Sequence, residues 1–224
     1  MLKIPFVAGL LMLSVFCNSA VAQSLNWADM DGVKHILTAN FALDYSVSYG
    51  IGYGYALNTR LPVVLNASLS APFGEEAVDD FKAKLGGQVC LLNKSNFVGA
   101  VSLFGIYRRY ENQLIQLQNF GSEMKGVIGF YKKQWFLAGE VGFDKAIVTH
   151  FRHSKTYRET IFPDVQDGWY EPATGGNFYY GIQTGYSFKR SACTLNIGSI
   201  MAQDFKTKPL IPYYLTLSYH HNFN

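Results

Sequence analysis

Large apolar residues alternate with small or polar ones along almost the whole chain, and this period of two limits the possible folds more than any other feature. Between residues 41 and 57, every odd position from Phe41 to Leu57 holds a large apolar or aromatic residue. The even positions between them hold Ala, Asp, Ser or Gly. Successive side chains of a β-strand point to opposite faces, so this segment predicts a strand with one apolar face and one small or polar face.

The same alternation recurs in later parts of the chain. The segments that show it are 61–69, 81–91, 135–148, 178–188 and 211–223. Short alternating segments separated by turn-forming residues predict strands and not helices. The sequence therefore predicts an all-β fold.

The composition of the two faces indicates what surrounds these strands. Charged residues make up 16% of the chain and hydrophobic residues 49%, whereas soluble domains carry roughly 25% charged residues. The second face is mostly Gly, Ala, Ser and Asn, which suits a narrow interior better than a surface in water. Because only a closed barrel satisfies every backbone polar group in lipid, we predict a closed antiparallel up-and-down transmembrane β-barrel. A soluble exported β protein is the alternative.

Residues 1–22 have the pattern of an export signal. Lys3 precedes a short apolar run, and Ala20 and Ala22 close the segment. A basic start, an apolar core and small residues two apart are typical of a signal peptide, here cleaved after Ala22. The run is shorter than the roughly 20 residues of a membrane helix. We expect an exported protein whose residues 23–224 form one barrel domain in the outer membrane.

The strand count depends on how residues 33–57 are divided. This stretch is longer than the roughly 9–11 residues of a membrane strand, and single-chain bacterial barrels have even strand counts. A three-residue turn at 44–46 preserves the alternation and gives strands at 33–43 and 47–57. We predict ten strands, with eight as the alternative, and an N-terminus on the periplasmic side.

The connections also divide into two classes. Four are short, at 58–60, 93–95, 132–133 and 189–191. The others are longer, near 73–79, 109–117, 150–175 and 204–209. Short turns at one end and long loops at the other are typical of outer-membrane barrels.

With its signal segment, its aromatic alternating strands and its final run from Leu215 to Phe223, the chain resembles the small outer-membrane β-barrel proteins of Gram-negative bacteria. The resemblance covers nearly all of residues 23–224 and implies an architecture and a location, not an activity. In that class the last strand usually ends in an aromatic residue that the barrel-assembly machinery recognises. Phe223 fits this role, although Asn224 follows it. The resemblance therefore implies this machinery as a partner during biogenesis.

Several charged residues fall on the small-residue face and are expected inside the barrel. They are Asp44, Lys82, Lys84, Glu140 and Asp144, with Glu123 and Lys125 as further members. A lone buried charge costs several kcal/mol, so these charges should pair and fill the lumen. Cys90 and Cys193 are expected on opposite faces and therefore unbridged. No spacing of His, Cys or acidic residues predicts a metal site or another cofactor.

Two groups of residues are candidates for function at the outer rim. His150 could act with the carboxylates of Asp79 and Asp80 as acid and base on a water molecule, which would make the protein a lipid A hydrolase or a protease. Alternatively, basic residues interleaved with aromatics could contact the phosphates of lipopolysaccharide. These basic residues are Arg108, Arg109, Arg152, Lys155 and Arg158.

Of these two hypotheses, the sequence favours the non-enzymatic one. It predicts a structural or surface-binding barrel that contacts outer-membrane lipid, lipopolysaccharide or a partner protein. The enzyme remains the alternative. The formal net charge of +3 is too small to predict nucleic-acid binding.

Overall fold

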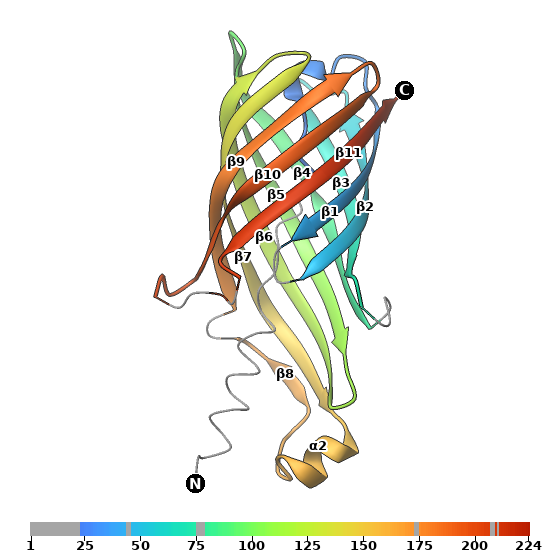
Figure 1. Ribbon diagram of the computed structural model, residues 1–224, viewed down its shortest axis with the longest axis vertical. Helices are drawn as coiled ribbons and strands as arrows, with labels where there is room; N and C mark the ends of the chain where they lie inside the picture. The colour runs from blue at the N-terminus through green and yellow to red at the C-terminus, as the bar shows by residue number, and fades with distance from the viewer. Residues whose placement is uncertain (1–22, 44–45, 75–78, 173–174, 207–208, 210) are drawn as a thin grey trace.

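The computed structural model describes residues 23–43, 46–74, 79–172, 175–206, 209 and 211–224, and it shows a closed barrel of ten long antiparallel strands (Figure 1). The barrel strands are β1 (His35–Leu43), β2 (Val47–Leu57), β3 (Val63–Pro72), β4 (Asp80–Lys94), β5 (Phe97–Glu111), β6 (Ile115–Tyr131), β7 (Trp135–His153), β9 (Gly176–Phe188), β10 (Ser191–Ala202) and β11 (Tyr213–Phe223). Pairing of β1 with β11, from His35 opposite Phe223 to Leu43 opposite Leu215, closes the barrel.

The prediction of ten strands is confirmed. The connection between β1 and β2 begins after Leu43 and ends before Val47, as the preserved alternation predicts. Asp44 and Tyr45 in this connection lie outside the described residues, as does the predicted signal peptide at 1–22.

Three short elements lie outside the barrel wall: η2 (Trp27–Asp29), α2 (Lys155–Thr160) and β8 (Gly168–Tyr170). Figure 1 shows η2 and the C-terminus at one end of the barrel, and β8 and α2 at the other. Within the described ranges, no helix has the length and apolar character needed to cross a membrane.

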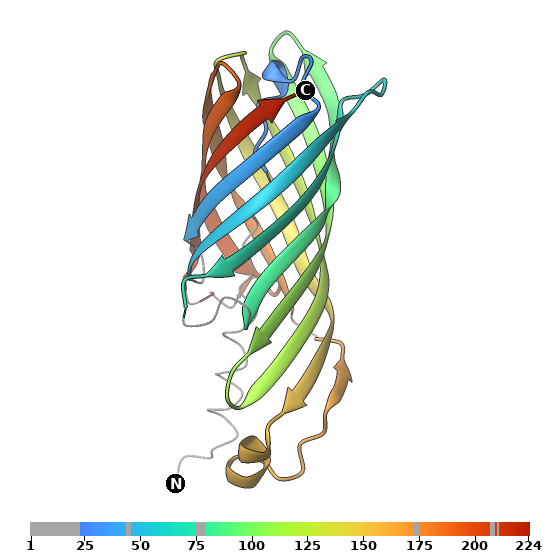
Figure 2. The same ribbon diagram turned by 90° about the vertical axis from the view of Figure 1, so that its right-hand side faces the viewer.

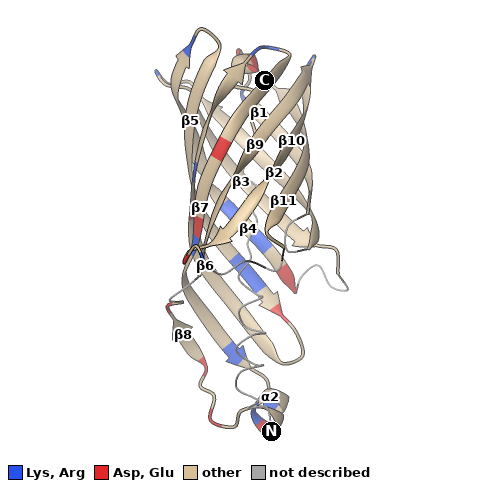
Figure 3. Cartoon of the chain, turned by 60° about the vertical axis from the view of Figure 1, so that its left-hand side comes forward, with Lys and Arg blue, Asp and Glu red and all other residues tan. Residues whose placement is uncertain are grey.

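The two faces of the strands differ as the alternation predicts. Large apolar side chains point outward and are exposed, for example Leu85 at 72% and Ile51 at 64%. Polar side chains such as Asn66, Ser102 and Thr194 point inward and are buried. Figure 3 shows few charged residues along the barrel strands between the two ends. An uncharged apolar band around a closed barrel is the surface expected against lipid.

The four short turns lie at the same end as η2, which we call the short-turn end. Two of them have only two residues, and one of these joins β4 to β5 through Ser95 and Asn96, whose φ angles are 51° and 69°. Positive φ at both central residues is the conformation of a type I′ hairpin, which matches the twist of the flanking strands.

The opposite end differs from the prediction at one connection. We predicted a loop at 109–117, but β5 continues to Glu111 and β6 begins at Ile115, so the loop spans only residues 112–114. The ends of β5, β6 and β7, together with β8, therefore extend beyond the barrel as a protruding sheet (Figure 2). We define this protruding sheet as residues 107–111, 115–120, 148–153 and 168–170.

A bulge in β7 reverses the alternation just before this sheet. Phe120 pairs with Val148 and Gly121 with Ala146, so that Ile147 has no partner on β6. Beyond the bulge, odd positions face inward: Thr149 is completely buried, and His150 lies on the outer face. Val148, predicted inward from simple alternation, is moved to the outer face by the same bulge.

Candidate functional sites

The inside of the barrel holds a connected set of charged and polar side chains. Lys84 on β4 forms an ion pair with Glu123 on β6, and Lys125 on β6 forms one with Glu140 on β7 at 3.4 Å. All four side chains are almost completely buried. Three further side chains complete what we call the lumen network: Tyr179, Asn196 and Tyr214.

The lumen network ties together strands that are not neighbours in the barrel. Tyr179 on β9 donates a hydrogen bond to Glu123 at 2.7 Å. Tyr214 on β11 and Asn196 on β10 donate to Glu140 at 2.6 and 3.0 Å. Because both carboxylates are paired with a lysine and also hydrogen-bonded, the desolvation cost of these buried charges is offset. The network therefore joins six of the ten strands across the lumen.

The other predicted lumen charges also face inward, where the structure describes them. Lys82 is 5% exposed and Asp144 is 2% exposed. One oxygen of Asp144 accepts hydrogen bonds from the backbone and side-chain nitrogens of Asn177, each at 3.1 Å. Asp44, the fifth predicted member, lies outside the described residues.

Residues 23–34 form an N-terminal plug inside the short-turn end, which the sequence did not predict. The side-chain Nε2 of Gln23 donates to Thr38 on β1 at 2.8 Å. Its Oε1 accepts from Asn66 on β3, and its backbone carbonyl accepts from Gln88 on β4 at 3.1 Å. One residue therefore contacts three strands.

The next residues of the N-terminal plug contact the other side of the barrel. Ser24 donates to Asn196 on β10 at 2.8 Å. The side-chain nitrogen of Asn26 lies within 3.0 Å of the carbonyls of the Lys132–Lys133 turn and of the Ser187 hydroxyl on β9. Trp27 is buried in an apolar cluster that includes Leu25, Ile36, Val64, Val98, Tyr131 and Phe136. The sequence signal for this plug is weak: a tryptophan in a segment without alternation shortly after the predicted cleavage site.

A row of ring side chains crosses the outer face where the protruding sheet leaves the barrel. The ring centroids of neighbouring members are 4.9 to 6.0 Å apart. In the order in which their rings contact one another, the members of this outer aromatic row are Phe81, Tyr107, Phe120, Trp169 and His150. Aromatic residues collect in this way at the interface between lipid and water.

The five basic candidates do not form one cluster. Arg108 points into the barrel, where it is 4% exposed and bonds both oxygens of Asp80. Its register position explains this, because Arg108 alternates with the outward-facing Tyr107 and Arg109. Lys155 and Arg158 belong to α2, beyond the protruding sheet.

Arg109 and Arg152 remain on the outer face, and with Glu111 they form what we call the arginine rim. The Arg109 guanidinium donates to Glu111 at 2.6 Å, and Glu111 also accepts from Gln116 at 2.9 Å. The hydrogen bond from Arg109, and to a smaller extent the charge of Arg152, lower the pKa of the Glu111 carboxyl. The buried Nε of Arg109 has no partner within the described residues. This N–H is therefore a donor without a protein acceptor in the described part of the chain.

An apolar groove of about 350 Å³ lies in the lipid-facing wall close to the arginine rim. Its side-chain lining comes from β2, β3 and β4: Tyr49, Ile51, Leu69, Ala71 and Phe81. Phe81 pairs in register with Arg109 on the neighbouring strand, on the same outer face. We call this depression the lipid-facing groove.

The candidate catalytic residues are not brought together. His150 lies on the outer face, with its ring 4.9 Å from Trp169. Asp80 faces inward, with its carboxylate bonded to Arg108, and Asp79 precedes β4 and accepts a backbone hydrogen bond from Glu111. The β7 bulge accounts for this separation, because it turns His150 away from the inner face.

A different histidine contacts a carboxylate at this end. The ring Nδ1 of His153 lies 3.0 Å from Asp167, whose other oxygen accepts from Arg158 at 2.6 Å. The hydrogen bond from Arg158, followed by the backbone N–H of His153, holds the pKa of Asp167 well below its ordinary value. The nearby Ser154 hydroxyl accepts from the backbone N–H of Tyr157 as the N-cap of α2. These contacts fold the loop after β7.

Within the described residues, no group of three or more His, Cys, Asp or Glu side chains is placed to hold a metal ion. Cys90 is buried and Cys193 exposed, and both are free thiols.

No protein-family model and no curated protein sequence matches the chain. Similar solved structures include a KdgM porin in complex with disordered oligogalacturonate, with a TM-score of 0.42 and 7% identity over 84% of this chain and 99% of that chain. The CymD monoaromatic hydrocarbon channel has a TM-score of 0.36 and 7% identity over 91% and 95% of the two chains. LpxR from Salmonella typhimurium has a TM-score of 0.30 and 11% identity, with coverages of 92% and 79%.

Proposed function

We propose that this protein is an integral outer-membrane barrel that binds a phosphate-bearing lipid of the outer leaflet, such as lipopolysaccharide, beside the protruding sheet. The lipid-facing groove would hold an acyl chain, and the arginine rim would contact the headgroup. The protein would act at the membrane surface, with the N-terminal plug closing its interior.

The observation that carries this proposal is the position of Phe81. Its ring lines the lipid-facing groove and also begins the outer aromatic row. Its register partner Arg109 lies on the same face, and its Nε has no hydrogen-bond partner among the residues that the structure describes. An apolar groove, an interfacial ring and an arginine therefore follow one another in the order of the acyl chain, the glycerol or sugar, and the phosphate of a lipid. Arginine suits phosphate because its planar fork donates two parallel hydrogen bonds.

The hydrolase alternative has less support. His150 and Asp80 lie on opposite faces of the sheet, and Asp80 is engaged by Arg108. His153 does contact Asp167, but Arg158 occupies the second oxygen of that carboxylate. Profiles of lipid A by mass spectrometry from cells that carry His150→Ala or Asp80→Asn test this alternative directly. We expect both profiles to match the wild type.

The test of the proposal is co-purification. Wild-type protein and the double variant Arg109→Ala with Arg152→Ala are extracted in mild detergent, and the lipopolysaccharide retained per barrel is measured by mass spectrometry. Lys155→Ala serves as the matched control, because it removes one positive charge from an 88% exposed side chain away from the groove. We expect the double variant to retain much less lipid and the control to retain as much as the wild type. Equal retention by all three proteins contradicts the proposal.

A further inference from the structure

We propose that the N-terminal plug closes a narrow passage through the barrel and that displacing the plug lets small ions and polar solutes cross. The plug is held mainly by neutral hydrogen bonds and by the apolar contacts of Trp27, with one further bond between the Asp29 carboxyl and Ser187. Bonds of this kind contribute about 1 kcal/mol each. The plug is therefore a more separable part of the molecule than any strand of the wall.

The lumen has two unlike walls. On β2 and β3 the inward positions hold very small side chains: Gly50, Gly52, Gly54, Ser68 and Ser70. The lumen network occupies the other wall, and its hydrogen bonds join β4, β6, β7, β9, β10 and β11. Within the described residues, none of these network bonds reaches β1, β2 or β3. The lumen network thus connects six strands across the lumen and makes no bond to the small-residue wall of β2 and β3.

The N-terminal plug is the element that bridges these two walls. Gln23 bonds to β1, β3 and β4, whereas Ser24 bonds to Asn196 in the lumen network. Gln23 also requires the glycines opposite it, because a Cβ on Gly52 would lie 2.9 Å from its Nε2 and a Cβ on Gly54 would lie 3.0 Å from its Oε1. The small-residue wall is therefore shaped to receive the plug.

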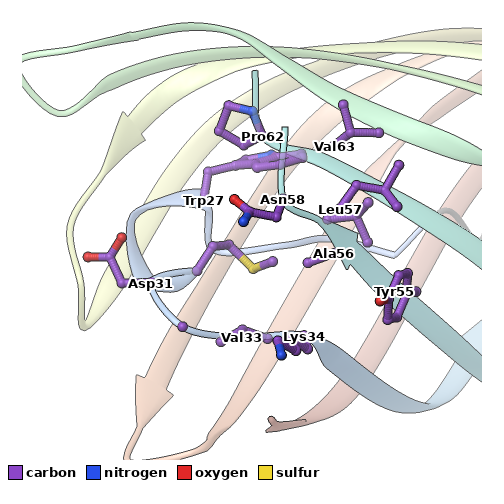
Figure 4. A pocket seen from close by; sticks show the side chains of 13 residues that line it. Trp27, Asp31, Val33, Lys34, Tyr55, Ala56, Leu57, Asn58, Pro62 and Val63 are labelled. Atoms are coloured by element: carbon purple, nitrogen blue, oxygen red, sulfur yellow. The ribbon is translucent and has the colours of Figure 1, made fainter. Parts of the chain in front are cut away.

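The plug also has free space beside it. A cleft of about 410 Å³ lies between the plug and the β2–β3 hairpin at the short-turn end (Figure 4). Trp27, Met30 and Val33 line it on the plug side, and Leu57 and Pro62 line it on the hairpin side. The plug can shift toward this cleft without displacing a strand.

The chemistry of the walls limits what would cross. Two lysines and two carboxylates of the lumen network neutralise each other pairwise, and the inward positions of β2 and β3 carry uncharged residues, mostly glycine and serine. A passage with these walls favours neither cations nor anions strongly. A ten-stranded barrel also leaves little room beyond its own side chains, so the permeants are small.

Planar-bilayer recordings in potassium chloride test the proposal. The released variant combines Gln23→Ala, Asn26→Ala and Trp27→Ala, and Leu65→Ala, which alters only an outward-facing side chain, is the matched control. Folding of each protein is checked by its heat-dependent shift on gels. We expect discrete conductance steps from the released variant with weak ion selectivity, and a closed baseline from the wild type and the control. A folded released variant that does not conduct overturns the proposal.

A covalent lock provides a second test, which remains decisive if the released variant fails to fold. Ser24→Cys and Asn196→Cys are introduced together in a chain without Cys90 and Cys193, because the side chains of Ser24 and Asn196 already lie 2.8 Å apart. We expect rare openings at high voltage that vanish on oxidation and return on reduction. Openings that oxidation leaves unchanged, or a reduced protein silent at every voltage, overturn the proposal. Lipopolysaccharide retention should be equal in all of these proteins, so this test is independent of the lipid site.

Discussion

The two ends of the barrel are built from different interactions. At the short-turn end, Trp27 is 6% exposed and most contacts of the N-terminal plug are neutral hydrogen bonds. At the opposite end, Trp169 is 56% exposed, and the loop around it depends on ion pairs such as Arg158 with Asp167. The difference indicates that one end seals the lumen and the other presents a surface. It also predicts that the two ends respond differently to mutation, pH and lipid.

The largest expected effect comes from the carboxylate that anchors the lumen network between the two ends. Replacing Glu123 with Ala leaves Lys84 buried without its partner, and loss of one member of a buried pair costs about 3–5 kcal/mol. Denaturant unfolding of the barrel in lipid vesicles measures this loss. Glu111→Ala is the control, because it removes a carboxylate from a partly exposed pair at the rim. We expect that control to leave stability almost unchanged, and equal losses from both variants would contradict the account.

A tryptophan substitution at each end compares the ends directly. Trp27→Ala empties a buried site in the apolar cluster, and we expect it to lower the free energy of unfolding by about 3 kcal/mol. Trp169→Ala removes an exposed ring, and its effect should stay within about 0.5 kcal/mol. The same unfolding measurement serves for both. A larger loss from Trp169→Ala would contradict the view that the short-turn end closes the lumen and the opposite end presents a binding surface.

Strong acid should loosen the loop after β7, which depends on an ion pair. The pKa of Asp167 is lowered in the folded loop, so its contribution is fully present above the ordinary aspartate pKa of about 3.9 and is lost as pH falls through the lower folded value. Tryptophan fluorescence in a chain lacking Trp27 and Trp135 follows this loop through Trp169. We expect a transition well below pH 4 that moves upward in Arg158→Gln. A wild-type transition at or above pH 4 would argue against the Arg158–Asp167 contact.

The smallest expected effect concerns the arginine rim, where it tests whether a lipid phosphate binds Arg109. Glu111 holds Arg109 in the unliganded protein and would compete with a lipid phosphate for the same guanidinium. We therefore expect Glu111→Gln to retain modestly more lipopolysaccharide than the wild type in the co-purification assay. Reduced retention would mean that Glu111 helps to hold the headgroup.

The strands and the inward charges follow from the sequence because alternation carries the information. A three-residue connection after Leu43 keeps the parity of β1 and β2, so both strands could be placed. Lys84 and Glu140 fall on the small-residue face by the same rule. Simple alternation fails at the β7 bulge, where an extra residue between Ala146 and Val148 turns His150 outward. No residue type at that point signals the bulge.

The N-terminal plug and the separation of the basic residues could not be predicted for a related reason. The contacts of Gln23 join residues up to 65 positions apart in the chain, and the segment itself has no periodicity. Arg108 and Arg109 are adjacent in the sequence but lie on opposite faces, and only the register of β5 shows which one reaches lipid. A site whose residues are brought together by strand register or by tertiary contacts can be located only in the three-dimensional structure.

The central claim is that the apolar face of every strand meets lipid and the small-residue face meets the lumen. Spin labels placed one at a time at positions 65 to 69 of β3, in a chain without Cys90 and Cys193, test it through their accessibility to oxygen in vesicles. Leu65 and Leu69 are 47% and 46% exposed, whereas Asn66 is 4% exposed. We predict high oxygen accessibility at 65, 67 and 69 and low accessibility at 66 and 68. Uniform accessibility, or the opposite alternation, would contradict the account.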